Sequence, residues 1–204
     1  LQLLSTRAAW GTFIGLFCLN YGWYFMVTWY PFYLVKQRGF TTEKMAVLGS
    51  LPFVMIAISA TIGGWLSDHL ISKGYTPTRI RKSFIVTGLL SGTVIYPAGI
   101  ATNDDVSMGL FLFTCFAFGL ASSNHWACTQ TMAGPSAASK WTGFQNGFGN
   151  FAGVAAGWVT GNIVDTTKSF DGAFLAVAGM LILGAFSYAF IIPELKQIDW
   201  EAKA

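Results

Sequence analysis

Charged residues are scarce in this sequence. Asp, Glu, Lys and Arg make up 10% of its 204 residues, whereas hydrophobic residues make up 53%; an ordinary soluble domain has about 25% charged residues. This composition excludes an ordinary soluble domain and indicates a protein that crosses a membrane several times. The net charge of +3 comes without a basic groove that carries aromatic side chains, so we expect no nucleic-acid partner.

Cysteine is also scarce, and the usual start of a secreted protein is absent. Cys18, Cys115 and Cys128 are odd in number and all lie in apolar stretches, which argues against a disulfide framework and predicts buried, reduced thiols. The sequence starts without a methionine and lacks the basic start and small-residue cleavage site of a signal peptide. We therefore expect a fragment of a longer protein.

Six apolar stretches are present, each long enough to cross a bilayer as a helix. The predicted spans are 8–35, 45–66, 83–101, 107–132, 142–164 and 172–192. Residues 1–204 are thus predicted to be one all-α membrane domain with six transmembrane helices. The first span is longer than the ~20 residues that a crossing needs, and Pro31, which has no amide hydrogen, predicts a bend or a helix end there. A short inner loop, 133–140, is expected between the fourth and fifth spans.

Segment 64–82, between the second and third spans, is the most strongly charged part of the sequence. Four of its five charged side chains are basic, so the positive-inside rule places this loop in the cytoplasm. Six spans then put both ends of the chain on the cytoplasmic side as well. The basic residues favour this assignment by eight to four: Arg7, Lys73, Arg79, Arg81, Lys82, Lys140, Lys196 and Lys203 inside, against Lys36, Arg38, Lys44 and Lys168 outside.

Asp68 is the acidic residue of this segment. We expect its carboxylate to form a latch with the basic residues Arg81 and Lys82 or with a helix end of another half of the protein. The alternative is that Asp68 caps backbone amides within the loop. Gly63 and Gly64 have no side chains, so a second helix can approach the backbone closely beside this carboxylate.

Polar side chains also lie inside the predicted spans. In the first span, Asn20, Tyr24 and Thr28 fall on one helical face with Tyr21 beside them. Lipid does not tolerate such a face well. It therefore points toward a wet cavity or forms hydrogen bonds with other helices, and the sequence leaves both open.

The fourth span carries the largest polar cluster. His125 could relay protons, as histidine does near neutral pH, or stay neutral and hydrogen-bonded inside the bundle, since burial disfavours the charged form. Trp126 could stack on a sugar-like ligand or only fill space. The cluster consists of Ser122, Ser123, Asn124, His125, Trp126, Thr129 and Gln130.

Glycines repeat every four residues in the fifth span. Such ladders let helix backbones pack closely in lipid. Asn146 and Asn150 share a face with part of the ladder, and Gln145 adjoins them, so we expect these amides to point toward the close-packed side. The glycines are Gly143 and Gly147, followed by Gly149, Gly153, Gly157 and Gly161.

The charged loop resembles the signature of the major facilitator superfamily, in which a glycine, a Ser-Asp pair, a second glycine and an Arg-Lys pair lie between two helices and act in gating. The matching residues are Gly64, Ser67, Asp68, Gly74, Arg81 and Lys82. Residues 20–34, NYGWYFMVTWYPFYL, are similar to the seventh helix of the anion:cation symporter branch, and 147–153 to its eleventh helix. One departure is 155–158, Ala-Ala-Gly-Trp, where the branch has a proline and small residues.

This resemblance implies that the chain is the C-terminal half of a twelve-helix transporter whose first six helices are absent. It implies symport of a small organic anion, such as a sugar acid or another carboxylate, through a cytoplasmic (inner) membrane. A proton is the expected coupling ion and sodium the alternative, with two halves rocking about a substrate near the midplane. In this branch, the basic residue for the carboxylate and the proton-binding acids lie in the first half.

The residues agree with that last point, because no charged residue lies at the centre of a predicted span. We expect no metal, no cofactor and no enzymatic activity. The only candidate catalytic group for an intramembrane enzyme is His125 beside Ser122 and Ser123. A self-assembling six-helix channel or membrane scaffold is the alternative to a transporter half. The candidate substrate contacts are Tyr21, Tyr24, Thr28, Ser123, Asn124, Trp126, Gln145, Asn146 and Asn150.

Overall fold

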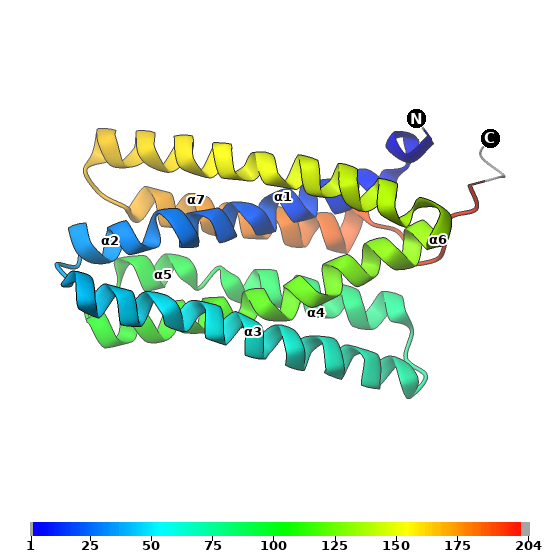
Figure 1. The fold of residues 1–204 in the computed structure, drawn as a ribbon, viewed down its shortest axis with the longest axis horizontal. Coiled ribbons are helices and arrows are strands. Elements are labelled where there is room, and N and C mark those ends of the chain that lie inside the picture. The colour runs from blue at the N-terminus through cyan, green and yellow to red at the C-terminus, as the bar shows by residue number, and fades with distance from the viewer. Residues whose placement is uncertain (1, 201–204) are drawn as a thin grey trace.

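The apolar stretches of the sequence form helices that lie side by side along one long axis in a computed structural model that describes residues 2–200 (Figure 1). In a bilayer, helices are favoured because each satisfies its own backbone hydrogen bonds. The predicted all-α fold is confirmed. The elements are η1 (Gln2–Ser5), α1 (Arg7–Thr28), α2 (Tyr30–Lys36), α3 (Thr42–Ser72), α4 (Pro77–Gly92), α5 (Ile95–Ile100), α6 (Asp104–Thr167), α7 (Asp171–Phe186) and the π-helix η2 (Ser187–Ile191).

Four helical segments of the described chain are long and apolar enough to cross a membrane. They are Thr42–Ser72, Pro77–Ile100, Asp104–Thr167 and Asp171–Ile191. α1 is not among them, and its middle carries Asn20, Tyr21 and Tyr24. The helices extend beyond several of the predicted spans, since α3 starts before residue 45 and ends after residue 66.

Prolines interrupt two of the helical segments. α1 ends at Thr28 and α2 starts at Tyr30, which confirms the break expected from Pro31. Pro97 acts in the same way between α4 and α5, because a proline leaves the carbonyl four residues earlier, here that of Thr93, without its helical partner.

α6 turns back on itself at Gly134, whose φ of 65° and ψ of 176° are not helical. Pro135 follows, and a residue before proline is kept out of the α region. We call 104–133 the first arm and 135–167 the second arm; the second returns along the opposite side of the bundle (Figure 1). The prediction of a loop at 133–140 is therefore wrong, because one glycine makes the reversal.

The C-terminal segment covers this reversal. The backbone N of Ile198 donates to the Met132 carbonyl at 2.9 Å, and Trp200 Nε1 donates to the Ala133 carbonyl at 2.8 Å. These bonds satisfy carbonyls that the end of a helix leaves unpaired.

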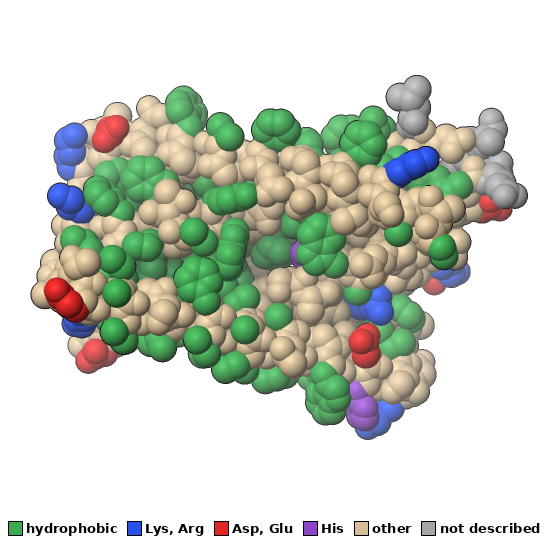
Figure 2. Space-filling view, in the orientation of Figure 1, with side chains coloured by type: hydrophobic (Ala, Val, Ile, Leu, Met, Phe, Trp, Pro, Cys, Tyr) green, Lys and Arg blue, Asp and Glu red, His purple; other side chains and the backbone are tan. Residues whose placement is uncertain are grey.

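Charged side chains gather at the two ends of the bundle, and apolar side chains cover its middle (Figure 2). Both ends of the described chain, η1 and residue 200, the α3–α4 turn and the reversal in α6 lie at one end (Figure 1), which we call the motif end. The turns that follow α2, α5 and α6 lie at the other. Lys203, one of the basic residues predicted to be cytoplasmic, lies outside the described residues.

α3 is the least covered of these helices. Only 11% of its most apolar stretch is buried, against 44% for α6 and for α7. The second arm of α6 also presents large apolar side chains outward, among them Phe151 and Trp158. Apolar surfaces of this extent face lipid or another protein surface. By contrast, Cys18, Cys115 and Cys128 are buried free thiols, as predicted.

Candidate functional site

The motif at 64–82 is mostly helical. α3 continues to Ser72 and α4 starts at Pro77, so the predicted loop is wrong in extent: only 73–76 lie outside the helices. Gly74 has a φ of +97°, where glycine avoids the strain of other residues. Thr76 caps α4, its Oγ1 accepting a hydrogen bond from the Arg79 backbone N at 3.4 Å.

Asp68 and Arg81 face each other across this turn, with Arg81 Nη2 3.5 Å from Asp68 Oδ1. The other terminal nitrogen of Arg81, Nη1, donates to the Ala127 carbonyl at 2.9 Å and to Thr131 Oγ1 at 2.8 Å. Arg81 of α4 therefore joins α3 to the first arm of α6. The ion pair expected from the sequence is present.

Of the neighbouring motif residues, Lys82 also connects two elements, whereas Ser67 bonds within its own helix. Lys82 Nζ donates to the carbonyls of Ala189 and Ile192 at 3.1 and 2.8 Å, near the end of η2. Ser67 Oγ donates within α3 to the Gly64 carbonyl at 2.9 Å.

Gly63 and Gly64 of α3 face the first arm of α6. A Cβ at Gly63 would lie 3.2 Å from the Leu120 Cα, whereas one at Gly64 would lie 3.6 Å from the Ser123 Cβ. The first distance is tight and the second is an ordinary contact. Gly63, which lies outside the family signature, is therefore the residue that permits the close approach.

A cavity of about 210 Å³ lies between α1, α3 and the first arm of α6. α1 contributes Asn20 and Trp23 to it, and the first arm contributes Ser122, His125 and Trp126, whose side chains carry polar atoms. The remaining lining is apolar, and none of the lining residues is charged. The full lining is Leu16, Leu19, Asn20, Trp23, Ile56, Phe118, Ser122, His125 and Trp126.

A second polar group joins α1 to the second arm of α6. Tyr24 Oη donates to Asn150 Oδ1 at 2.6 Å, and Asn150 Nδ2 donates to the Asn146 carbonyl at 2.8 Å. Asn20 lies one helical turn before Tyr24, and its Nδ2 is 3.2 Å from the position of a Cβ at Gly149. Asn20 thus lies between the cavity and the Tyr24–Asn150 pair.

The glycine ladder packs closely over only part of its length. A Cβ at Gly149 would lie 2.7 Å from the Leu16 side chain, and one at Gly153 would lie 3.2 Å from the Tyr24 ring. Asn146 and Asn150 are exposed. The prediction that they point toward tight packing is therefore wrong, because the second arm presents the helical face that carries them to the outside. A Cβ at Gly143, Gly147 or Gly157 would touch no other part of the described chain within 4 Å, apart from its own chain neighbours and helix backbone.

Three of the predicted contact residues are buried between helices and do not line the cavity. Tyr21 is 2% exposed, Asn124 1% and Gln145 0%. Gln145 Oε1 accepts from Thr129 Oγ1 at 2.6 Å, and its Nε2 donates to the Thr12 carbonyl at 3.4 Å. Asn124 Nδ2 donates to the Leu120 carbonyl at 3.3 Å and weakly to that of Gly63 at 3.5 Å.

Of the remaining candidates, Trp126 lines the cavity, Ser123 is half-buried beside Gly64, and Thr28 is exposed at the end of α1. Asn20, Ser122 and His125 line the cavity although they were not among the predicted contacts. The sequence contained part of the information needed to predict these lining residues, because Asn20 shares a helical face with Tyr24 and His125 belongs to the polar cluster.

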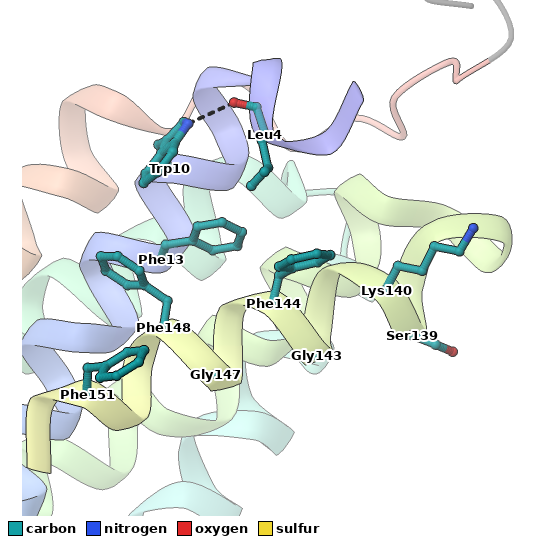
Figure 3. A pocket seen from close by; sticks show the side chains of 10 residues that line it. All are labelled: Leu4, Trp10, Phe13, Ser139, Lys140, Gly143, Phe144, Gly147, Phe148 and Phe151. Atoms are coloured by element: carbon teal, nitrogen blue, oxygen red, sulfur yellow. Dashed lines mark hydrogen bonds between the residues drawn. The ribbon is translucent and has the colours of Figure 1, made fainter. Parts of the chain in front are cut away.

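Another cavity, of about 540 Å³, is a different kind of surface (Figure 3). Aromatic rings from α1 and the second arm line it, with Ser139 and Lys140 at one end. Such a surface offers little to a polar solute and suits lipid or another helix. Its lining is Leu4, Trp10, Phe13, Ser139, Lys140, Gly143, Phe144, Gly147, Phe148 and Phe151.

Ionisable groups are sparse inside the bundle. Every Asp and Glu between residues 2 and 200 is exposed. Within the same range, no three His, Cys, Asp or Glu side chains come together in a group that could hold a metal ion.

Known proteins match this chain over most of its length. A family model described as Major Facilitator Superfamily matches residues 1–157. A probable galactarate/D-glucarate transporter of Escherichia coli (strain K12) is 31% identical over 198 residues, which are 97% of this chain and 44% of that protein. A hexuronate transporter of Bacillus subtilis (strain 168) is 31% identical over 179 residues, 86% of this chain and 42% of that protein. A D-galactonate transporter of Escherichia coli O6:H1 is 27% identical over 200 residues, which are 97% of this chain and 45% of that protein. The chain spans less than half the length of these curated relatives.

Proposed function

This chain belongs to the Major Facilitator Superfamily, and we propose that it forms the C-terminal six-helix half of a twelve-helix transporter for small organic anions, in particular sugar acids. The family expected from the motif is confirmed, and the matching proteins are transporters rather than enzymes. The substrate class is proposed because the relatives carry the names of sugar-acid transporters.

Six membrane crossings can be assigned to the helices. They are α1 with α2, α3, α4 with α5, the first arm of α6, the second arm of α6, and α7 with η2. α6 is long enough for two crossings, since its 64 residues would extend about 96 Å if straight and a bilayer core is about 30 Å thick. The even number of crossings agrees with the two chain ends lying at the same end of the bundle (Figure 1).

The observation that carries the proposal is the uncharged cavity between α1, α3 and the first arm of α6, whose mostly apolar lining includes the polar groups of Asn20, Ser122 and His125. Its volume of about 210 Å³ is below the roughly 300–1,000 Å³ of pockets that enclose a small molecule. A cavity of this size and polarity is what one wall of a site between two halves would present. The exposed apolar surfaces of α3 and the second arm would then meet the first half or lipid.

The coupling ion is proposed to be a proton, with sodium as the alternative. Because the described carboxylates are all exposed, the groups that bind the ion would belong to the first half, as would the cation that pairs with the substrate carboxylate. Rocking of the two halves would expose the solute to each side in turn. The basic side chains at the motif end favour its placement on the cytoplasmic side of the inner membrane.

Uptake by the complete transporter tests this function. Proteoliposomes that contain it should take up labelled galactarate, a hexuronate or D-galactonate saturably, and an inward proton gradient should drive accumulation. A sodium gradient applied alone identifies the coupling ion. Failure to take up any of the three acids under either gradient would contradict the proposal.

A further inference from the structure

A hollow lined by charged side chains lies at the end of the bundle opposite the motif end. It has a volume of about 280 Å³ and lies between α2, the end of the second arm of α6 and the turn before α7. Charged side chains gather at this end of the molecule (Figure 2). We call the hollow the outer pocket, because the proposed orientation places this end on the outer side of the membrane. Its charged lining residues are Lys36, Asp165 and Lys168.

The charges of the outer pocket are not neutralised within the bundle. Among residues 2–200, no ion pair joins Lys36, Asp165 or Lys168 to one another or to any other residue. Arg38, a basic residue at the same end, is instead paired with Asp104 at 3.2 Å. Two ammonium groups and one carboxylate therefore line one hollow without pairing, and the basic groups outnumber the acidic one.

An amide and two aromatic rings complete the lining. Gln37 Oε1 accepts a hydrogen bond from the Phe170 backbone N at 3.2 Å, which holds the amide in place and leaves its Nε2 as a donor. The Phe170 side chain is 3% exposed, whereas that of Phe32 is 43% exposed, and both line the pocket. The outer pocket thus combines charged, polar and apolar groups.

The turn that carries Lys168 has an unusual backbone conformation. Lys168 follows the last residue of α6 and is the only non-glycine residue between 2 and 200 with a positive φ, of 57°. Glycine adopts this conformation at lower cost, so the turn alone does not account for a lysine here. Conformations of this kind are frequent where a side chain serves a binding site.

The groups of the outer pocket match a hydroxylated acid. Lysine ammonium groups only donate hydrogen bonds, so Lys36 and Lys168 suit a carboxylate; the Asp165 carboxylate only accepts, so it suits a ligand hydroxyl. The aromatic rings suit the C–H groups of a carbon chain. By contrast, the cavity between α1, α3 and the first arm has no charged lining residue and offers a carboxylate no cation.

We propose that the outer pocket is a docking site for the sugar acid, at which the carboxylate binds Lys36 and Lys168 before the solute enters the space between the two halves. This inference rests on the proposed function. A basic hollow of this kind raises the local concentration of an anion and its rate of association. It therefore lowers KM and leaves the turnover of the loaded transporter unchanged.

Uptake kinetics of the complete transporter in phosphatidylcholine vesicles test the site. The substrate is the first of galactarate, D-galactonate and a hexuronate that the wild type takes up. Lys36→Gln combined with Lys168→Gln should raise KM by roughly twofold to twentyfold at low salt, as expected for the loss of two exposed ion pairs. The variant should keep kcat, and about 0.5 M salt should remove most of the difference in KM, because salt screens exposed charges.

Two further variants serve as controls. Lys44→Gln removes a basic residue at the same end that does not line the pocket, since Lys44 Nζ lies 3.8 Å from the centre of the Phe40 ring; its KM should stay at the wild-type value. Lys36→Arg combined with Lys168→Arg keeps both charges and should keep KM within about twofold. A merely structural role of the lysines would give neither this rescue nor the dependence on salt.

Three results would overturn the docking site: a wild-type KM in the double glutamine variant, an equal rise of KM in Lys44→Gln, or a rise that appears only after anionic phosphatidylglycerol is added to the vesicles. The last result would assign the lysines to a lipid headgroup. All three leave uptake by the wild type intact and so do not affect the proposed function. A wild-type transporter that takes up none of the three acids would contradict the proposed function, and the docking site with it.

Discussion

Asp68 and Arg81 form an ion pair across the α3–α4 turn, but only Arg81 is held firmly in place. The Arg81 side chain is 18% exposed and also bonds to Ala127 and Thr131, whereas the Asp68 side chain is 73% exposed. An exposed ion pair contributes about 0–1 kcal/mol, so this pair adds little stability within the described residues. The Asp68 carboxylate is therefore accessible to a helix end or basic group of the first half that we propose.

We predict that Asp68→Asn shifts the complete transporter toward its inward-open state and slows cycling. A charge-assisted contact at a partly desolvated interface contributes about 1–3 kcal/mol, which shifts a two-state population by roughly fivefold to more than a hundredfold. Distances between spin labels on the cytoplasmic rims of the two halves measure this shift. Unchanged distance distributions would contradict the latch.

Replacing Arg81 should cost more stability than replacing Asp68. Arg81→Ala removes charge-assisted bonds to the Ala127 carbonyl and Thr131 Oγ1, and we expect a loss of about 1.5–3 kcal/mol in the free energy of unfolding. Arg79→Ala is the control, because Arg79 is an exposed neighbour on the same helix and should change stability by less than about 0.5 kcal/mol. Equal unfolding midpoints for the two variants in detergent would contradict this assignment.

Asn150→Ala should weaken substrate binding in the complete transporter by a few-fold to about tenfold, the effect of losing one neutral hydrogen bond of about 0.5–1.5 kcal/mol. Asn162→Ala is a matched control, because Asn162 Nδ2 donates to the Trp158 carbonyl at 2.8 Å just as Asn150 Nδ2 donates to that of Asn146. If Asn150 only joined helices through Tyr24, its variant would keep wild-type affinity and unfold at a lower temperature.

Gln145→Leu should lower stability and leave affinity nearly unchanged. Gln145 is fully buried between Thr129 and Thr12, and its loss leaves buried polar groups unpaired, at about 1–3 kcal/mol. Thermal unfolding and substrate competition, measured on the same sample, separate the two effects. A large loss of affinity at unchanged stability would restore Gln145 to the substrate contacts predicted from the sequence.

The sequence predicted the helices better than it predicted which side chains meet. The lengths of the apolar stretches located the helices, and Pro31 located one of the breaks between them. Both inferences depend on local backbone chemistry. The reversal in α6 was predicted at the right place but as a loop of several residues, whereas a single Gly-Pro pair, Gly134 and Pro135, makes it. α3 continues beyond its apolar stretch, because Ser67, Asp68 and His69 are compatible with a helix that extends out of the membrane.

The candidate site was predicted in part for a related reason. Helical periodicity places residues on one face of their own helix but does not tell how that helix is rotated in the bundle. Trp126, one of the predicted substrate contacts, lines the cavity, and the predicted contacts Tyr24 and Asn150 bond to each other. Gln145 and Asn124 turned out to bridge helices, while His125 and Asn20 occupy the cavity wall.

The most direct test of the account is transport by this chain alone. Liposomes that contain only these 204 residues should hold an inserted, helical protein that shows no saturable uptake of galactarate, a hexuronate or D-galactonate and no ion flux, because the proposed site needs a second wall. The complete transporter, reconstituted in parallel, should take up at least one of these acids. Substrate-specific, saturable uptake by the isolated chain would contradict the two-half account, and ion flux through it would favour a self-assembling channel.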